Sequence, residues 1–325
     1  MSRPVATFIV LYFSRFTTDT AVSIGLRRIV HRPLQMSKPS ILFLQHEFDN
    51  PLAGSRYIAA LLKQNWEQNG YPVQCVRGVR EQIPADLLFV HIDVTVVTDE
   101  YLDFMSHYPV VINGRVTDIS KDRISSHLLQ RGDEYPGPVI VKTKANFGGR
   151  QDLKLMARAG LDPLELDLHQ RPWRKIETLD SYDYPVFDSP RAVPPGVWKN
   201  PRLVVEKFVA ERNEDGHYVM RNWFFLGDEG FTRSVSSPHR IVKPSDHPPP
   251  GRETHLHFLD EPIHPGLHEL RKNLGFDHGR FDYVMADGQP VVFDANTTPV
   301  IVEEGIRMHE KQFLEDLPKG LLSFL

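Results

Sequence analysis

The chain has 325 residues, 41% hydrophobic and 25% charged, enough to bury a substantial core in two domains or one composite domain. Its formal net charge of -4 gives no general basic field, so nucleic acid and anionic membranes are not expected partners: only a local patch could bind them, and none is present beyond candidate phosphate-binding residues. A single cysteine, Cys75, excludes an intramolecular disulfide and a CxxC motif, which indicates a reducing compartment and a cytoplasmic protein.

The first residues contain one apolar run, at 5–13, which is far too short to span a bilayer. A secretory signal would need a basic start and a small-residue cleavage site, but the start has only Arg3 and an arginine-bearing polar stretch follows. Met36 opens a segment that begins directly with a strand pattern. We therefore expect residues 1–36 to be an extension that is disordered or lies upstream of the true start.

Residues 37–118 alternate between strand and helix patterns, which is typical of a small α/β domain. The patterns predict, in order, a strand, a helix, two strands, a helix and a strand, within 41–48, 55–70, 71–78, 85–93, 99–108 and 109–113. The run 87–92 is apolar except for His91, as in a buried parallel strand. Ligands of open α/β sheets collect beyond the carboxyl ends of the strands. Most residues there are expected to be solvated loop residues; the candidates are His46, Glu47, His91, Asp93, Asn113 and Arg115.

The segment 121–150 is locally cationic, with six Lys or Arg against three acids. In "GPVIVKTKANFGGR" an apolar β-branched strand delivers Lys142, and a loop with paired glycines, Gly148 and Gly149, follows. Lysine neutralises phosphate oxygens, and glycine lets backbone N–H groups approach them. The pattern indicates a phosphate-binding strand and loop, and a plain hairpin is the alternative.

The next stretch, 160–201, is rich in proline and irregular, which argues against a regular helix or a central strand. We expect it to be a substrate-shaping insertion.

Strand patterns resume at 202 with "RLVVEKFVAE", an apolar strand that breaks at Glu206. Such a segment can pair with adenine through backbone groups while nearby acids meet ribose hydroxyls, and a plain edge strand is the alternative. Further strands, a helix near 262–275 and a hairpin at 280–296 follow. Arg221 lies mid-strand among apolar residues, where an unpaired charge is costly, so its partner is either a phosphate or carboxylate ligand or a structural acid.

The last hairpin opens a stretch with five acids and no lysine or arginine between Asp282 and Glu304. Side chains alternate along a strand, so Asp294 and Asn296 share one face while Phe293 points the other way. Two carboxylates, from Asp282 and Asp294, and the amide oxygen of Asn296 are hard ligands suited to Mg²⁺ (or Mn²⁺) that is shared with substrate phosphates. The alternative is a solvated polar face.

The turn of this hairpin is expected to decide whether Asp282 joins the site. A two-residue turn at 287–288 would pair Asp282 with Phe293 and turn it away from Asp294. A three-residue loop at 286–288, ending in a left-handed glycine and a G1 bulge, would bring four side chains to one face: Arg280, Asp282, Asp294 and Asn296. The metal site is therefore predicted only with an odd-numbered loop.

Other chemistry finds little support in the sequence. His255 and His257 in "THLHF" share one strand face like a zinc pair, but no third ligand at convincing spacing accompanies them, so we expect surface or phosphate-proximal histidines. Ser/His/Asp and Cys/His nucleophile patterns are absent.

In this order and with these spacings, the three segments resemble the ATP-grasp superfamily, which includes D-alanine:D-alanine ligase and glutathione synthetase. The resemblance covers about residues 110–305. Lys142 matches the phosphate-binding lysine, the Gly148 loop matches the flap over the phosphates, "VEKFV" matches the adenine hinge, and "RFDYV" with "FDAN" matches the metal motif. The nucleotide-binding residues that the resemblance implies are Lys142, Lys144, Gly148, Gly149, Glu206, Lys207, Val209, Glu211 and Glu214.

The resemblance implies a mixed α/β (α+β) architecture. It consists of an amino-terminal Rossmann-like substrate-side domain at 37–118, a central ATP-grasp lobe at 119–205 and a carboxy-terminal lobe with the metal site at 206–325. The superfamily usually supplies another lysine upstream of the one in "VIVK", and here only Lys121 is a loose candidate.

The reaction that the resemblance implies is an ATP- and magnesium-dependent ligation. A substrate carboxylate attacks the γ-phosphate, and an amine or thiol opens the acylphosphate to release ADP and phosphate. The cations that would stabilise the transferring phosphoryl group are Lys142, Arg221, Lys243 and Arg280. Small-molecule carboxylates and amines are the expected partners, and a homodimer is left open. A small-molecule kinase with the same ATP site and a non-catalytic nucleotide-binding module are the alternatives.

Overall fold

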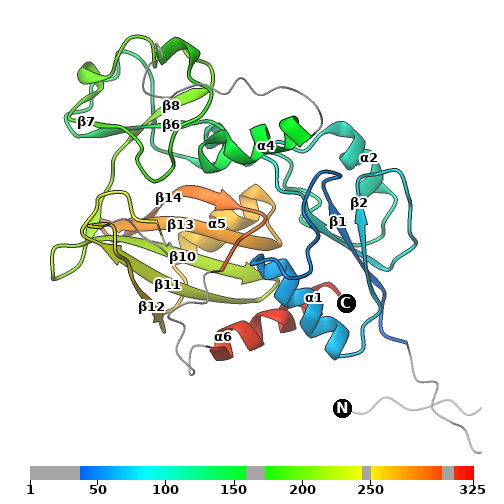
Figure 1. The fold of residues 1–325 in the computed structure, drawn as a ribbon. Helices are drawn as coiled ribbons and strands as arrows, with labels where there is room; N and C mark the ends of the chain where they lie inside the picture. The colour runs from blue at the N-terminus through cyan, green and yellow to red at the C-terminus, as the bar shows by residue number, and fades with distance from the viewer. Residues whose placement is uncertain (1–36, 159–172, 244–249, 302–310) are drawn as a thin grey trace, which may run out of the picture. The chain divides into compact units, whose positions relative to one another are not determined.

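The computed structural model describes residues 37–158, 173–243, 250–301 and 311–325 (Figure 1). The chain divides into two compact units, Met1–Ser37 and Lys38–Leu325, and every element below belongs to the second. The predicted extension at 1–36 and the acids Glu303 and Glu304 lie outside the described residues. Within the described ranges, no helix has the length and apolar character to cross a membrane.

The first sheet consists of parallel strands in the order β2-β1-β3-β4: β1 (Ile41–Gln45), β2 (Val73–Arg77), β3 (Leu87–His91) and β4 (Val111–Ile112). Every residue of β1 and β3 is buried because both faces of the sheet are covered. Alternate residues of β1 enter two cores, one with helix α1 (Ile58–Gln68) and one with α2 (Asp99–Ser106). The predicted order of strands and helices in this part of the chain is therefore correct.

A second, antiparallel sheet has the order β5-β8-β6-β7: β5 (Leu128–Leu129), β6 (Val139–Thr143), β7 (Val186–Phe187) and β8 (Leu203–Lys207). Helix α3 (Lys121–Ile124) precedes it, and the turn η1 (Asn146–Gly149) with helix α4 (Arg150–Arg158) follows β6.

The described part of the proline-rich stretch, 173–201, belongs to this second sheet. It contributes the edge strand β7 and two short 3-10 helices, η2 (Trp173–Lys175) and η3 (Pro190–Ala192). Its residues Ile176, Tyr184 and Val197 are buried in one core with β6 and β8. The prolines are tolerated because they lie at the sheet edge and in turns.

The third sheet is antiparallel, with the order β12-β11-β10-β13-β14 and β9 paired to β10: β9 (Glu211–Arg212), β10 (Tyr218–Leu226), β11 (Glu229–Ser237), β12 (His255–Leu259), β13 (His278–Ala286) and β14 (Gln289–Asn296). Helix α5 (Pro265–Leu274) lies against one face of this sheet (Figure 1). Its Leu267 lies in one core with Trp223, Phe225 and Phe281. The other face carries the polar residues described below. The predicted mixed α/β class is confirmed.

The end of the chain, α6 (Lys311–Asp316) and η5 (Leu317–Phe324), links the first and third sheets. Leu317 and Leu321 lie in one core with Trp66 of α1 and Phe224 of β10. Among the sequence candidates at the strand ends, Asn113 has a structural role: its Oδ1 accepts hydrogen bonds from the backbone N–H groups of Asp277, at 3.0 Å, and His278, at 2.9 Å.

Two fully buried histidines in this region make stability depend on pH. Burial lowers the pKa of both His91 and His278 to about 3, so they are neutral in the folded chain. In the unfolded chain they take up protons below about pH 6.5. The contribution of the two neutral histidines to the free energy of unfolding is complete above about pH 6.5 and is lost as the pH falls from about 6.5 towards 3.

We therefore expect the free energy of unfolding to fall by roughly 2 kcal/mol between pH 7 and pH 5, as measured by urea denaturation. Asp49, whose pKa burial raises to about 6, titrates in the opposite sense and limits the loss. His91→Gln should flatten the pH dependence. An equally steep dependence in this variant would contradict the assignment.

Candidate functional site

The hairpin turn differs from the prediction. Ala286 pairs with Gln289, so the loop contains two residues, Asp287 and Gly288. Both have left-handed backbone angles, with φ of 50° and 74°, as a type I′ turn requires. The predicted three-residue loop is therefore wrong: an Asp-Gly pair satisfies the tighter turn, whose twist matches that of the strands.

The carboxylates nevertheless share one face, because the register shifts next to Asp282. Tyr283 pairs with Val292, but Asp282 pairs with Asp294, which leaves Phe293 as an extra residue in β14. With a two-residue turn alone, Asp282 would pair with Phe293. The extra residue of this β-bulge shifts the pairing by one, so that Asp282 pairs with Asp294. The expectation that a two-residue turn would separate Asp282 from Asp294 is wrong. Phe293, expected to point away, lines the same cavity as Asp294.

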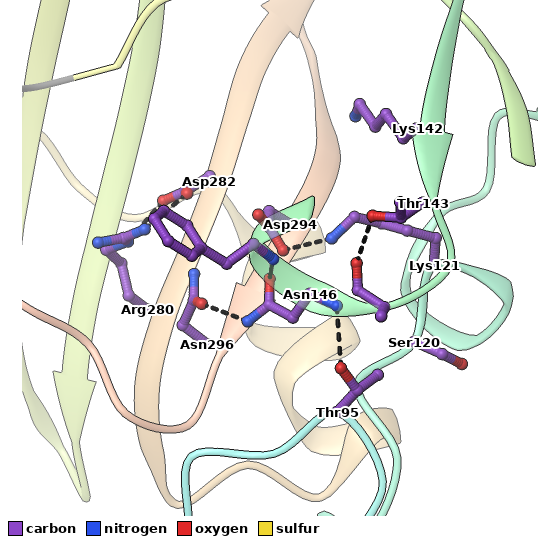
Figure 2. Close-up of polar contacts among 12 residues, drawn as sticks. Thr95, Ser120, Lys121, Lys142, Thr143, Asn146, Arg280, Asp282, Asp294 and Asn296 are labelled. Atoms are coloured by element: carbon purple, nitrogen blue, oxygen red, sulfur yellow. Dashed lines mark hydrogen bonds and ion pairs between the residues drawn. The ribbon is translucent and has the colours of Figure 1, made fainter. Parts of the chain in front are cut away.

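Polar contacts hold these side chains on the face of the third sheet that α5 does not cover (Figure 2). Arg280 binds Asp282 through two bonds, Nε to Oδ1 at 2.7 Å and Nη2 to Oδ2 at 2.8 Å. Asn222 Nδ2 also donates to Asp282 Oδ1, at 2.7 Å. Lys121 Nζ donates to Asp294 Oδ1 at 2.6 Å. The carboxylates are thus fixed by charged or amide donors before any ligand binds.

The third predicted metal ligand, Asn296, is held by the loop that follows β6. Its Oδ1 accepts a hydrogen bond at 2.7 Å from Nδ2 of Asn146, which follows strand β6 (Figure 2). The backbone N–H of Asn146 in turn donates to Thr95 Oγ1 at 2.9 Å. The loop after β6, the first sheet and the third sheet therefore meet at one point.

The chemistry of these donors fits magnesium shared with a ligand. Asp282, Asp294 and Asn296 offer only hard oxygen donors. Within the described ranges there is no group of three or more His, Cys, Asp or Glu that could hold a metal, and a metal ion at these two carboxylates would need further oxygens from a ligand. Burial alone would raise the pKa of Asp294, but Lys121, Lys243 and Lys142 lower it below its usual value. Asp294 is therefore an anion at neutral pH.

An apolar cavity adjoins this face between the second and third sheets. Its walls come from β6, the segment after β8, β10 and the hairpin, and include Ile140, Val209, Met220, Val242, Val291 and Phe293. Lys142 Nζ lies 2.5 Å from Glu206 Oε2, and both side chains are buried. The same ammonium lies 4.9 Å from the Phe293 ring centroid. Flat apolar walls beside two lysines, Lys121 and Lys142, suit a ligand with a ring and an anionic tail.

Three consecutive residues of the glycine loop have left-handed backbone angles: Phe147, Gly148 and Gly149. A Cβ on Gly148 would lie 2.2 Å from the carbonyl oxygen of Leu179. The Gly148 carbonyl accepts a hydrogen bond from the Leu179 N–H at 3.2 Å. The loop is therefore closely packed against the proline-rich stretch, and glycine is required there.

We expect Gly148→Ala to lower the free energy of unfolding by roughly 2–4 kcal/mol, because the added methyl meets backbone and not a flexible side chain. Gly216→Ala is the matched control: Gly216 has a φ of 78° but nothing within 4 Å of an added Cβ. It carries the backbone penalty alone, roughly 1 kcal/mol. Equal melting temperatures for the two variants would contradict the packing role of Gly148.

Several predicted residues do not reach this face. Arg221 donates from Nη2 to Glu211 Oε1 at 2.7 Å and from Nη1 to Glu261 Oε1 at 2.5 Å. Arg221 follows Met220 along β10 and therefore points to the opposite face. Of the two partners considered from the sequence, a ligand anion or a structural acid, Arg221 has the structural acid. Glu211 is occupied by this pair, and Glu214 is exposed in the turn before β10. Lys144 pairs with Asp122 at 2.5 Å and is absent from the cavity wall.

Other predicted residues do lie at the cavity. Lys207 and Val209 line it, and Lys207 Nζ also lies 5.2 Å from the ring centroid of Tyr135. Lys243 lines it as well and interacts electrostatically with Asp294 and Asp282. Burial lowers the pKa of Lys243, and the two carboxylates oppose that shift.

Three residues absent from the predicted site complete it. Lys121, only a loose candidate in the sequence, is 2% exposed and contacts Asp294. Asn222 and Arg233 lie on neighbouring strands, and Arg233 Nε donates to Asn222 Oδ1 at 3.1 Å. Asn222 could have been noticed in the sequence, because it is a polar residue in the otherwise mostly apolar strand β10. The sequence gives no such signal for Arg233, because its strand β11 also contains serine and threonine and a polar residue does not stand out there.

Positive side chains outnumber negative ones around this face. Among the described residues at this face and its cavity, the cations are Lys121, Lys142, Lys207, Arg233, Arg240, Lys243 and Arg280. The acids are Glu206, Asp282 and Asp294. Burial of uncompensated charge is costly, so the surplus favours an anionic ligand.

No family model matches the chain, and no curated protein matches it. Among solved structures, the D-alanine–D-alanine ligase of Bacillus anthracis matches with a TM-score of 0.45 and 10% identity, covering 87% of this chain and 98% of that one. The macrocyclase MdnC of Microcystis aeruginosa MRC, bound with the precursor peptide MdnA, matches with a TM-score of 0.45 and 12% identity, covering 87% and 99%. The ATP-grasp ligase PsnB, complexed with a minimal precursor, matches with 0.48 and 9%, covering 87% and 98%.

At these identities the likeness concerns the fold, and the chemistry of the chain has to be inferred from its own residues. The chain resembles the ATP-grasp superfamily in its sequence motifs, and the solved structures that it resembles include ATP-grasp ligases.

Proposed function

We propose that the chain is an ATP- and magnesium-dependent ligase that joins a carboxylate substrate to an amine or thiol through an acylphosphate. The observation that carries this proposal is the meeting of Asp282, Asp294 and Asn296 on one face, beside an apolar cavity and a surplus of cations. Each part suits one portion of ATP: the cavity its base, the lysines its phosphates and the carboxylates a shared metal ion.

In this proposal the adenine lies between the walls of the second and third sheets, near the backbone of the segment from Glu206 to Val209. The phosphates extend from there towards three ammonium groups: Lys121, Lys142 and Lys243. Lys142 is paired with Glu206 in the described structure, so its charge is already positioned at the cavity. Lysine suits this task because its ammonium can contact several phosphate oxygens at once.

Asp282, Asp294 and Asn296 would hold Mg²⁺ or Mn²⁺, which would neutralise developing charge on the phosphates. Lys121 has a supporting role, since its contact with Asp294 keeps that carboxylate ionised and oriented. Arg280 and Asn222 orient Asp282 in the same way. These contacts reduce the reorganisation that binding of a metal–nucleotide complex would need.

In this proposal the reaction has two steps. A carboxylate oxygen of the substrate forms a bond to the γ-phosphorus while the bond to the β–γ bridging oxygen breaks and ADP leaves. The amine or thiol attacks the acyl carbon, phosphate leaves with the bonding electrons, and the nucleophile loses a proton. Arg280 would stabilise the charge that develops between the carboxylate and the phosphoryl group.

We further propose that 37–118 forms the substrate-side domain, with 119–205 and 206–325 as the two lobes around the nucleotide, in a cytoplasmic protein. The segment that follows the carboxyl end of β3 contacts the loop after β6, through the Thr95–Asn146 hydrogen bond. Ligands of parallel sheets bind at such ends.

A screen for ADP release tests the function. The chain is incubated with ATP and Mg²⁺ and a panel of amino acids and small carboxylates, alone and with amines or thiols. ADP release that needs both a carboxylate and a nucleophile is expected. Release with a hydroxyl acceptor alone would support the kinase alternative. A flat screen with measurable ATP binding would support a non-catalytic nucleotide-binding module and contradict both enzymatic proposals.

A further inference from the structure

The hydroxyl group of Tyr184 connects the proline-rich stretch to the glycine loop after β6. Tyr184 is buried in the core of the second sheet, just before β7. The next residue, Pro185, accepts a hydrogen bond at 2.9 Å from the backbone N–H of Val141, which fixes the tyrosine beside β6. The Tyr184 hydroxyl interacts with the Thr143 side chain and accepts a hydrogen bond from the Gly148 N–H. One side chain of the proline-rich stretch thus reaches both ends of the loop.

The hydroxyl groups of Tyr184 and Thr143 form a relay of hydrogen bonds. Thr143 Oγ1 donates to the Ala145 carbonyl at 2.9 Å, so its own hydrogen is already used. The Tyr184 hydroxyl therefore donates to Thr143 Oγ1 while it accepts from Gly148. The relay runs from the Gly148 N–H through two hydroxyl groups to the Ala145 carbonyl. Hydrogen bonds in such a chain polarise and strengthen one another.

The neighbouring N–H groups of the loop also have partners inside the protein (Figure 2). The N–H of Asn146 donates to Thr95 Oγ1 at 2.9 Å, and that of Phe147 donates to Asn146 Oδ1 at 2.9 Å. With Gly148, three consecutive N–H groups are engaged. In this conformation they can bind phosphate oxygens only after these hydrogen bonds break.

The backbone of the loop is one that needs support from its surroundings. Phe147 has a φ of 47°, a left-handed angle that is unfavourable for a residue other than glycine. Gly148 follows with a φ of 69°, and its carbonyl accepts a hydrogen bond from the Leu179 N–H. Leu179 and Tyr184 both belong to the proline-rich stretch. This stretch therefore supplies contacts that hold a conformation which the loop sequence alone does not favour.

The relay borders the candidate site. Tyr184 and Asp294 line the same cavity. Burial raises the pKa of Tyr184, so its hydroxyl keeps the proton that it donates to Thr143. On another side of the loop, Asn146 Nδ2 donates to Asn296 Oδ1 at 2.7 Å. The loop thus adjoins both the cavity and a candidate metal ligand, and its order affects any ligand bound there.

We propose that Tyr184 is a positioning residue that holds the glycine loop in its binding conformation before a nucleotide arrives. This inference rests on the proposed function, which assigns the cavity to ATP, and deepens it by naming the residue that orders the loop. A loop that is already ordered adds no ordering cost to the binding step, so nucleotide affinity is not reduced by a sparsely populated conformation. Side chains such as that of Lys142, and not the N–H groups of residues 146–148, then contact the phosphates.

Amide hydrogen exchange of the full chain without nucleotide tests this order. Exchange is followed by mass spectrometry in peptides that cover residues 144–150, with a synthetic peptide of the same sequence as reference. The loop should exchange at least about 10-fold more slowly than the reference, and Mg²⁺ with the non-hydrolysable analogue AMP-PNP should slow it by less than about twofold more. Tyr184→Phe keeps the ring in the core. It should speed loop exchange about 5-fold or more and raise the Kd for AMP-PNP about 3- to 10-fold.

Tyr182→Phe is the matched control, because it removes the same atom from a tyrosine two positions away that is absent from the cavity wall. It should change neither loop exchange nor the Kd for AMP-PNP. Thr143 provides a second comparison. Thr143→Ser keeps the relay and should retain slow exchange, whereas Thr143→Val interrupts it and should speed exchange. The double variant Tyr184→Phe/Thr143→Val should exchange no faster than the faster single variant, since both changes interrupt one relay.

Several results would overturn the proposal. One is loop exchange as fast as in the reference peptide, with protection appearing only when AMP-PNP binds, because the nucleotide would then order the loop. Another is unchanged exchange in Tyr184→Phe, and a third is faster exchange with an unchanged Kd for AMP-PNP. Circular dichroism and urea unfolding show whether Tyr184→Phe folds; if it does not, Thr143→Val and Thr143→Ser carry the same comparison.

Failure of the proposed function gives a different result. A chain that binds no AMP-PNP, but whose loop exchanges slowly and depends on Tyr184, would contradict the nucleotide site and leave the ordering of the loop by Tyr184 standing. The exchange measurement without nucleotide thus separates the two failures.

Discussion

Asp294→Asn is expected to reduce ATP turnover about 10³-fold or more, because it removes a negative charge from the candidate metal site while it preserves the shape of the side chain. The substitution also leaves the ammonium of Lys121, now 2.6 Å from Asp294 Oδ1, without a charged partner in a buried position. Turnover is measured as ADP release with Mg²⁺. Nucleotide affinity measured with and without EDTA should show that the variant has lost its magnesium dependence.

The same hairpin supplies a control for this variant. Asp287 lies in the exposed turn with a φ of 50°, a conformation that asparagine tolerates well. Asp287→Asn therefore makes the same chemical change on the same hairpin, away from the cavity, and should retain full turnover. An unchanged rate in Asp294→Asn would contradict both the ligase and the kinase proposals.

Lys142→Met is expected to weaken ATP binding roughly 10- to 100-fold, since it removes a charge-assisted contact to phosphate. It also leaves the buried carboxylate of Glu206 without its partner 2.5 Å away, so the free energy of unfolding should fall. The double variant Lys142→Met/Glu206→Gln removes both charges. It should recover stability but not ATP affinity, and this difference separates the nucleotide-binding role of Lys142 from its structural role.

Affinity is measured by equilibrium titration with ATP and Mg²⁺, and stability by urea denaturation. Lys199→Met is the control because Lys199 is exposed in the same lobe and is absent from the cavity wall. If the double variant regained ATP affinity along with stability, Lys142 would serve the fold alone, and the phosphate-binding assignment would be wrong.

The sequence was sufficient wherever local pattern decides structure. The apolar run at 87–92 identified β3 as a buried parallel strand, because a strand covered on both faces has little polar side. Alternation placed Asp294 and Asn296 on one face, since successive side chains of a strand point in opposite directions. The Asp-Gly pair at the hairpin tip was also recognisable, but its loop length was predicted wrongly.

The sequence could not reveal the register beyond the turn. The bulge at Phe293 returns Asp282 and Asp294 to one face, and the contacts around it are tertiary: Phe293 packs against the core of Met220, Val235 and Val242, while Asp282 meets Asn222 on β10. Contacts with a third strand, and not the turn, thus determine where Asp282 points. A bulge adds one residue to one strand at small cost, so local sequence rules do not locate it.

For the charged residues of the site, too, the sequence predicted one part and only the tertiary structure decided the rest. Residue types alone predicted a phosphate-binding strand at Lys142 and showed an acidic hairpin with hard oxygen donors. Only the tertiary structure brought Lys121 to Asp294 across 173 positions, turned Arg221 to the opposite face and buried Arg233 beside Arg280. The physical reason is that sequence specifies which side chains can carry charge, whereas burial and distance, which decide how those charges interact, arise only when distant strands pair.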